Sequence, residues 1–202
     1  MCYSPEASIG TFLFVAAISA FLWVRNHPLD RPVALIFLVV VIMQLLEFLI
    51  WISLDSPERL GYLTKAIPFI LLLQPLLFML IHWVYKSGWG LFYREAFFFL
   101  LLLFPFAIYS IYSQVKGVVK VGTSGHLEWP VGAYMWSPWI NAMYWFFLVY
   151  GFGSLKNIPL SIGMVGGAYL SYSIFERNRP EVWPSMWCHI VNFLSVLAVL
   201  GN

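Results

Sequence analysis

Two side chains that can take part in chemistry lie inside a long apolar stretch, which runs from Val33 to Leu54. Gln44 and Glu47 are three residues apart and Trp51 is four further on, so a helix places all three on one face. A charged side chain at the centre of a bilayer costs roughly 2.5–3.5 kcal/mol to insert, and ionisable residues there usually mark a working site. The structural alternative is a protonated Glu47 that only shares a hydrogen bond with a neighbouring helix.

A second set of polar side chains lies within the last apolar stretch, residues 184–200. Four of them fall at intervals of three or four residues, namely Ser185, Cys188, Asn192 and Ser195, with His189 at the edge of the same stripe. This spacing indicates one polar face on a helix. We therefore expect that face to point into the protein.

Gln74 precedes Pro75 in a third apolar stretch, residues 64–85. Proline has no backbone N–H and crowds the carbonyl four residues earlier, at Leu71, so we expect a kink beside Gln74. A free carbonyl beside an amide is a notch where a ligand can bind. We interpret His82, at the far end among aromatic residues, as an anchor at the membrane interface rather than as a ligand.

The composition excludes a soluble globular domain, because 61% of the 202 residues are hydrophobic and only 10% are charged. The mean hydropathy is +0.82. The chain has room for about seven spans of about 20 residues each. The fold class is therefore predicted to be an all-α, polytopic membrane helix bundle, with residues 1–202 as one domain. The net charge of +2 is spread over many loops, so a nucleic-acid partner is excluded.

The apolar runs give the expected boundaries of the spans, which are residues 9–24, 33–54, 64–85, 96–112, 139–155, 159–175 and 184–200. Ser4, Pro5 and Glu6 are typical of a helix start, with Ser4 as the N-cap. Residues 115–137 form the one sizeable segment outside the membrane. Alternating residues on both sides of a Gly122–Gly125 turn predict a short hairpin there.

Small residues recur on two of the expected helices. Ser8, Thr11, Val15 and Ser19 form a mildly polar stripe on the first helix, which should face other helices. Gly163, Gly167 and Ser171 recur every four residues on the sixth, which allows another helix to approach closely. This second pattern predicts a packing seam and offers a face for oligomerisation.

Seven spans would bring the polar residues to similar depths. Glu47 would lie roughly 11 Å and His189 roughly 8 Å below the same membrane face, with the three amides somewhat deeper. The predicted pocket is lined by Gln44, Glu47, Trp51, Gln74 and Asn192, with His189 as an accessory residue. Since removal from water disfavours a charged carboxylate, we expect Glu47 to be protonated at neutral pH. An even number of spans would separate these residues.

Several short motifs together resemble an uncharacterised family of small multi-span membrane proteins found in bacteria and large DNA viruses. They are Met1-Cys2-Tyr3-Ser4, Gln44-x-x-Glu47 with Trp51, His126-Leu127-Glu128-Trp129 and Trp187-Cys188. Phe48 stands where that family has a glycine, and His189 where an aromatic residue is usual. The family has no established activity, so the resemblance implies an architecture and a set of residues.

Three classes of function fit these residues. A polar pocket around Glu47 favours binding or transport of a small polar solute, a proton or a cation. The alternatives are an intramembrane metal-dependent or thiol enzyme that uses Glu47, Cys188 and His189, or a structural or assembly protein. The chain contains no HxxxH, HExxH or CxxC motif, and its last span has no lysine for retinal. We therefore predict no metal site and name no cofactor.

Cys2 and Cys188 are the only cysteines, and seven spans place both near one membrane face. On an oxidising side they would pair as a disulfide. The alternatives are two inert thiols and a soft-metal site shared with His189. The positive-inside rule places the N-terminus outside the cytosol, once the lysines of the longest loop, Lys116 and Lys120, are discounted.

Overall fold

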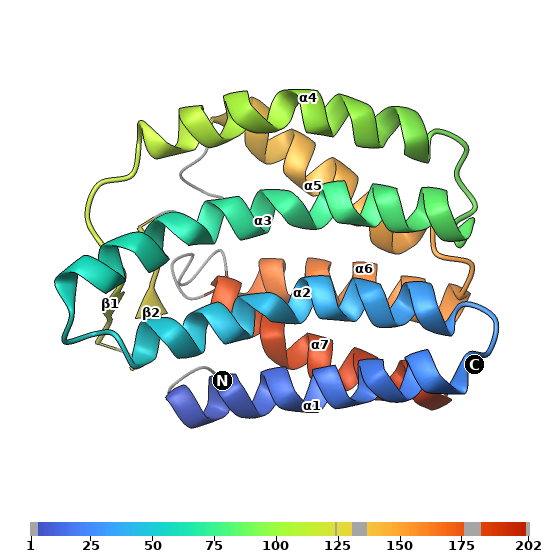
Figure 1. The fold of residues 1–202 in the computed structure, drawn as a ribbon, viewed down its shortest axis with the longest axis horizontal. Coiled ribbons are helices and arrows are strands. Elements are labelled where there is room, and N and C mark those ends of the chain that lie inside the picture. Colours follow the sequence, from blue (N-terminus) through green and yellow to red (C-terminus); the bar gives the residue numbers. More distant parts are fainter. Residues whose placement is uncertain (1–3, 124, 131–136, 176–182, 201–202) are drawn as a thin grey trace.

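The chain folds into a bundle of α-helices that lie alongside one another (Figure 1). This computed structural model describes residues 4–123, 125–130, 137–175 and 183–200, and for residues 168, 171–175 and 183–190 it describes the backbone alone. In chain order the elements are α1 (Pro5–Arg25), α2 (Asp30–Trp51), α3 (Pro57–Tyr85), α4 (Tyr93–Tyr112), β1 (Lys120–Val121), β2 (Leu127–Glu128), α5 (Pro138–Gly153), α6 (Ile158–Phe175) and α7 (Trp183–Leu200). The predicted all-α helix bundle is confirmed.

The first helix begins as its sequence predicts. The Ser4 hydroxyl accepts a hydrogen bond from the backbone N–H of Ala7 at 3.3 Å, Pro5 is the first helical residue, and Glu6 lies in the first turn. This cap satisfies one of the N–H groups that a helix start leaves without a partner. At the other end Asn26 adopts a left-handed conformation and its N–H donates to the carbonyl of Leu22, so α1 ends there.

The third helix starts earlier than expected, at Pro57 rather than Thr64. Ser56 is extended and Pro57 occupies the first helical position, where the missing N–H of proline costs nothing. The helix then continues through Pro68 and Pro75 to Tyr85, for a total of 29 residues. Its N-terminal turns therefore extend beyond the apolar stretch.

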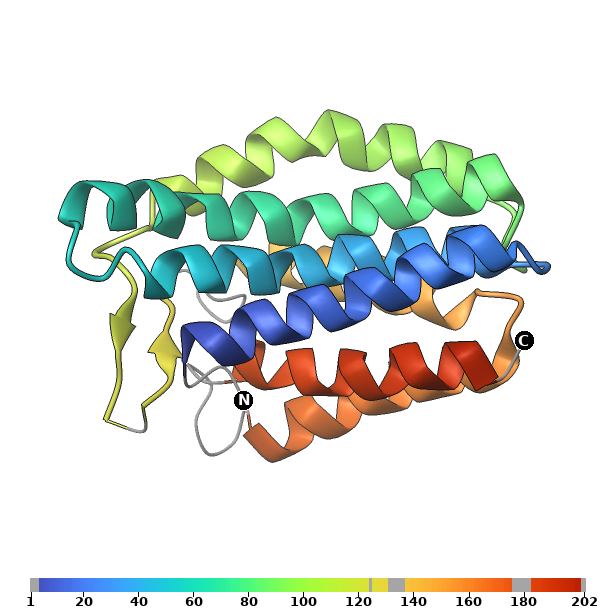
Figure 2. The ribbon, with the colours of Figure 1, turned by 60° about the horizontal axis from the view of Figure 1, so that its bottom comes forward.

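The packing of the helices makes α3 the centre of one half of the bundle. Helix α3 contacts α2, α4 and α5, while α1 packs on α2 and α7, and α6 connects α5 to α7. Figure 2 shows α1 beside both α2 and α7. Helix α4 lies at the periphery, and of its residues only Tyr93 and Ile111 are buried.

The core has two parts. The larger one joins apolar side chains from α1 to α7, and the smaller one joins the C-terminal half of α2, the N-terminal half of α3 and the hairpin. In the smaller core Leu127 and Trp129 of the hairpin pack beside Ile50 and Leu60. The hairpin therefore closes the end of the α2–α3 pair (Figure 1).

The hairpin itself confirms the prediction from alternating residues. Strands β1 and β2 are antiparallel, with Lys120 opposite Glu128 and Val121 opposite Leu127. The Lys120 ammonium lies 3.1 Å from the Glu128 carboxylate. Gly125 in the turn has a φ of 75°, a conformation that favours glycine.

The small-residue seam of the sixth helix is confirmed at Gly163. A β-carbon at this position would lie 2.8 Å from Leu194 Cδ2 of α7, so the glycine lets the two helices of this chain approach closely. The side chain of Ser171 lies outside the described residues. Oligomerisation through this face stays a prediction.

Among the described residues, four helices, α1 to α4, are long and apolar enough to cross a membrane. Their lengths are 21, 22, 29 and 20 residues, against about 20 for one span. Helices α6 and α7 contain the shorter apolar stretches Ile158–Gly167 and Val191–Leu200. The chain thus has several candidate membrane spans, and the count of seven spans stays a prediction.

A buried ion pair ties α1, α2 and α7 together at the end of the bundle where α1 meets α2. The Arg25 guanidinium donates to both carboxylate oxygens of Asp30, at 2.8 and 2.7 Å, and to the carbonyl of Val199 at 2.9 Å. The backbone N–H of His27 also donates to Asp30. Asp30 has no exposed surface, so its charge is compensated entirely by protein groups.

Candidate functional site

Glu47 and Gln44 lie together inside the bundle. Their exposed fractions are 0% and 1%, and Gln44 Nε2 donates a hydrogen bond to Glu47 Oε2 at 2.8 Å. The spacing of three residues along α2 makes this contact possible, because side chains at i and i+3 share a helix face. The expected direction of both side chains, toward the interior, is confirmed.

Trp51 is the last residue of α2 and is half-buried. Its ring packs against the smaller core, beside the hairpin. Its Nε1 atom is shielded from solvent and has no hydrogen-bond partner among the described residues. Trp51 thus lies on the same helix as Glu47, one turn closer to the hairpin.

Gln74 connects α3 to α5. It is 4% exposed, and its Oε1 accepts a hydrogen bond from the Tyr144 hydroxyl at 3.3 Å. Tyr144 is also buried. Gln74 is thus a buried polar group, as expected. Its described hydrogen-bond partner belongs to α5, a helix that contributes no residue to the predicted pocket.

Asn192 connects α7 to α1. Its Nδ2 donates to Thr11 Oγ1 at 3.2 Å, and Ser195 donates to the carbonyl of Asn192 at 2.7 Å. Thr11 belongs to the buried face of α1, together with Ser8 and Ser19. The stripe on α1 therefore faces other helices, and Asn192, from the described part of the stripe on α7, meets it at this interface.

The structure thus distributes the predicted pocket residues over three places. It brings Gln44 and Glu47 together on α2, links Gln74 to α5, and links Asn192 to α1. That the three places form one pocket stays a prediction.

The remaining candidates lie outside the described residues. Cys2 precedes them, and the side chains of Cys188 and His189 are not among those described. Within the described ranges there is no group of three or more His, Cys, Asp or Glu residues that could hold a metal ion. The disulfide, the accessory role of His189 and the enzyme alternative all stay predictions.

His82 is a buried residue, so its interpretation as an interfacial anchor was wrong. It has no exposed surface; its Nε2 lies 2.7 Å from the carbonyl oxygen of Gly151, and its Nδ1 lies 2.9 Å from the Ser87 hydroxyl. A carbonyl only accepts, so we assign the proton to Nε2 and let Ser87 donate to Nδ1. The sequence does contain a signal for burial of His82. His82 follows Phe78 by four residues and Met79 by three, so all three share the face that α3 buries.

Backbone hydrogen bonds join two loops next to the contacts of His82. Ser87 accepts a backbone hydrogen bond from Lys156 at 2.9 Å, and Trp89 donates one to Ser154 at 2.7 Å. The α3–α4 connection therefore pairs with the α5–α6 connection, beside the His82 bridge. His82 joins α3 to α5 as a structural residue.

The predicted family resemblance is neither supported nor opposed by comparison with known proteins: no protein-family model, curated protein or solved structure matches this chain.

Proposed function

We propose that this chain is a multi-pass integral membrane protein in which Glu47, supported by Gln44, binds a proton or a small cation within the bilayer. The observation that carries the proposal is the hydrogen bond of 2.8 Å between two side chains that are 0% and 1% exposed. Both lie on α2, one of the candidate spans. Ionisable residues placed in this way commonly serve proton and ion pathways.

The chemistry of the pair suits a proton that is taken up and released. An amide N–H can donate to Glu47 Oε2 whether the carboxyl group is neutral or charged, while the proton is carried by the other oxygen. Gln44 therefore holds the carboxyl group in one orientation in both states. A purely structural pair has no need of the acid, since glutamine at position 47 can also accept this hydrogen bond.

The first prediction tests whether position 47 needs an acid or only a hydrogen-bond acceptor. In liposomes that contain a pH-sensitive dye, the wild-type protein is expected to carry protons down an imposed gradient. Glu47→Gln is expected to reduce this flux to the level of empty liposomes, because the amide keeps the hydrogen bond but has no titrating proton. Glu58→Gln, an exposed glutamate at the start of α3, is the matched control and should leave the flux unchanged.

Equal fluxes for wild type and Glu47→Gln, with both proteins folded to the same extent, would show that the pair is structural. The same liposomes loaded with a sodium- or potassium-sensitive dye decide between a proton and a cation. Wild-type liposomes that carry none of the three ions faster than empty ones would contradict the proposal.

We also propose that the N-terminus lies on the non-cytosolic side. The α1–α2, α3–α4 and α5–α6 connections lie at one end of the bundle (Figure 1), with Arg25, Arg31, Lys86, Arg94 and Lys156 near them. The acidic residues there, Asp30 and Glu95, are both paired with arginines. Once Lys116 and Lys120 of the longest loop are discounted, these five basic residues exceed the four that remain elsewhere in the chain. The end with more basic residues in its short loops is the one that stays in the cytosol.

This orientation gives a second prediction. In a Cys2→Ser, Cys188→Ser chain, a cysteine introduced by Lys120→Cys in the hairpin is expected to react with a membrane-impermeant maleimide added to intact cells. A cysteine introduced by Lys86→Cys should react only after the membrane is permeabilised. The reverse pattern would invert the orientation, and labelling of both in intact cells would contradict the arrangement of the loops.

A further inference from the structure

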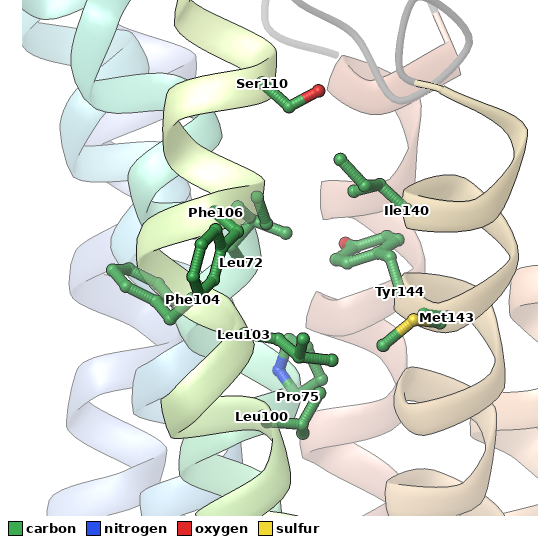
Figure 3. A pocket seen from close by; sticks show the side chains of 11 residues that line it. Leu72, Pro75, Leu100, Leu103, Phe104, Phe106, Ser110, Ile140, Met143 and Tyr144 are labelled. Atoms are coloured by element: carbon green, nitrogen blue, oxygen red, sulfur yellow. The ribbon is translucent and has the colours of Figure 1, made fainter.

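A cavity lies between α3, α4 and α5, away from the Glu47 pair. Its volume is about 280 Å³. Figure 3 shows side chains of α4, among them Leu103 and Ser110, facing Ile140 and Tyr144 of α5 across the gap. Helices α4 and α5 each pack on α3, so α3 forms the floor of the cavity.

The walls of this cavity are almost entirely apolar. The polar groups in the lining are the hydroxyls of Ser110 and Tyr144, and the Tyr144 hydroxyl already donates to Gln74. Pro75, which also lines the cavity, has no backbone N–H to offer. A ligand that fits these walls is therefore a hydrocarbon rather than a polar solute.

The shape of the cavity restricts the ligand further. Its lining on α4 extends from Leu100 to Ser110, which corresponds to roughly 15 Å along a helix. A volume of about 280 Å³ spread over that length suits an extended hydrocarbon chain rather than a compact ligand.

The end of the cavity at Ser110 lies near two lysines. Tyr112, in the same turn of α4, donates a hydrogen bond to the carbonyl of Lys65 at 2.6 Å, which places Lys65 beside this end. Lys116 follows shortly after α4. Both lysines are exposed, and neither forms an ion pair within the described part of the chain.

The length of α3 allows Lys65 to lie at the depth of a lipid headgroup. The part of α3 from Lys65 to Tyr85 rises by roughly 30 Å, the thickness of the hydrocarbon core. A lysine at that boundary can extend its ammonium to a lipid phosphate. We propose that the cavity holds one acyl chain of an anionic phospholipid, whose phosphate lies at Lys65 and Lys116.

Native mass spectrometry of the delipidated protein in detergent tests this proposal, with dioleoylphosphatidylglycerol and dioleoylphosphatidylcholine as probes. The wild type is expected to retain one phosphatidylglycerol and to prefer it over phosphatidylcholine by roughly thirtyfold, because each lysine near an anionic lipid contributes about 1 kcal/mol. Ala107→Phe fills the cavity and should abolish retention. Leu102→Phe is the matched control, since Leu102 is on the same helix, 70% exposed and outside the lining.

A second filling variant, Ile140→Phe on α5, serves if Ala107→Phe does not fold, and it should have the same effect. The double variant Lys65→Gln, Lys116→Gln should still retain one lipid but lose the preference, whereas Lys86→Gln at the other end should keep it. Retention by the filled variants equal to that of Leu102→Phe would overturn the site. An unchanged preference in the double lysine variant would overturn the headgroup assignment. Both outcomes are independent of proton flux through the Glu47 pair.

Discussion

Asp30→Ala is expected to lower the free energy of unfolding by about 3 kcal/mol, because it removes one partner of a buried ion pair and leaves the other behind. The Asp30 side chain is fully buried and that of Arg25 is only 16% exposed. Arg25 would keep its hydrogen bond to Val199 but lose both contacts to the carboxylate. The backbone N–H of His27 would lose its acceptor as well.

Unfolding in detergent with increasing fractions of sodium dodecyl sulfate, followed by circular dichroism, measures this effect. The control is Glu95→Ala, which breaks the Arg94–Glu95 pair on α4. Those two side chains are 61% and 53% exposed, and exposed pairs contribute about 0–1 kcal/mol. Equal losses for the two variants would show that the Asp30 pair does not hold α1, α2 and α7 together.

His82→Leu is expected to lower the free energy of unfolding by about 2–4 kcal/mol. The leucine fills most of the space of the imidazole but cannot form hydrogen bonds. The buried Gly151 carbonyl and the buried Ser87 hydroxyl therefore lose the partner that His82 provides. Each buried polar group that loses its hydrogen bond costs about 1–3 kcal/mol. The ring contact with Tyr93, whose centroid lies 4.9 Å away, is lost too.

Two further variants show how much of this loss of stability comes from the hydrogen bonds of His82. Ser87→Ala removes one of the two hydrogen bonds and should cost about 1 kcal/mol. His27→Leu changes an exposed histidine at the same end of the bundle and should leave stability almost unchanged. If His82→Leu were no more destabilising than His27→Leu, the bridge between α3 and α5 would not contribute to stability.

The sequence was informative for several features that depend on residues close together in the chain. Ser4 and Pro5 start α1, the alternation around Gly125 forms the hairpin, and the Gln44–Glu47 contact follows from a spacing of three residues. These features rest on local geometry: a helix turn, a cap or a two-residue strand period involves only neighbours.

The tertiary structure decided which partner each buried polar group has. Tyr144 is 70 residues from Gln74, and Thr11 is 181 residues from Asn192. The Gly151 carbonyl is 69 residues from His82, and Val199 is 174 residues from Arg25. Helical periodicity can indicate that a side chain such as Asn192 faces inward, but it carries no information on which helix lies opposite. That choice, like the cavity between α3, α4 and α5, depends on how the described helices pack. A buried polar group takes its partner from whichever helix the packing places against it.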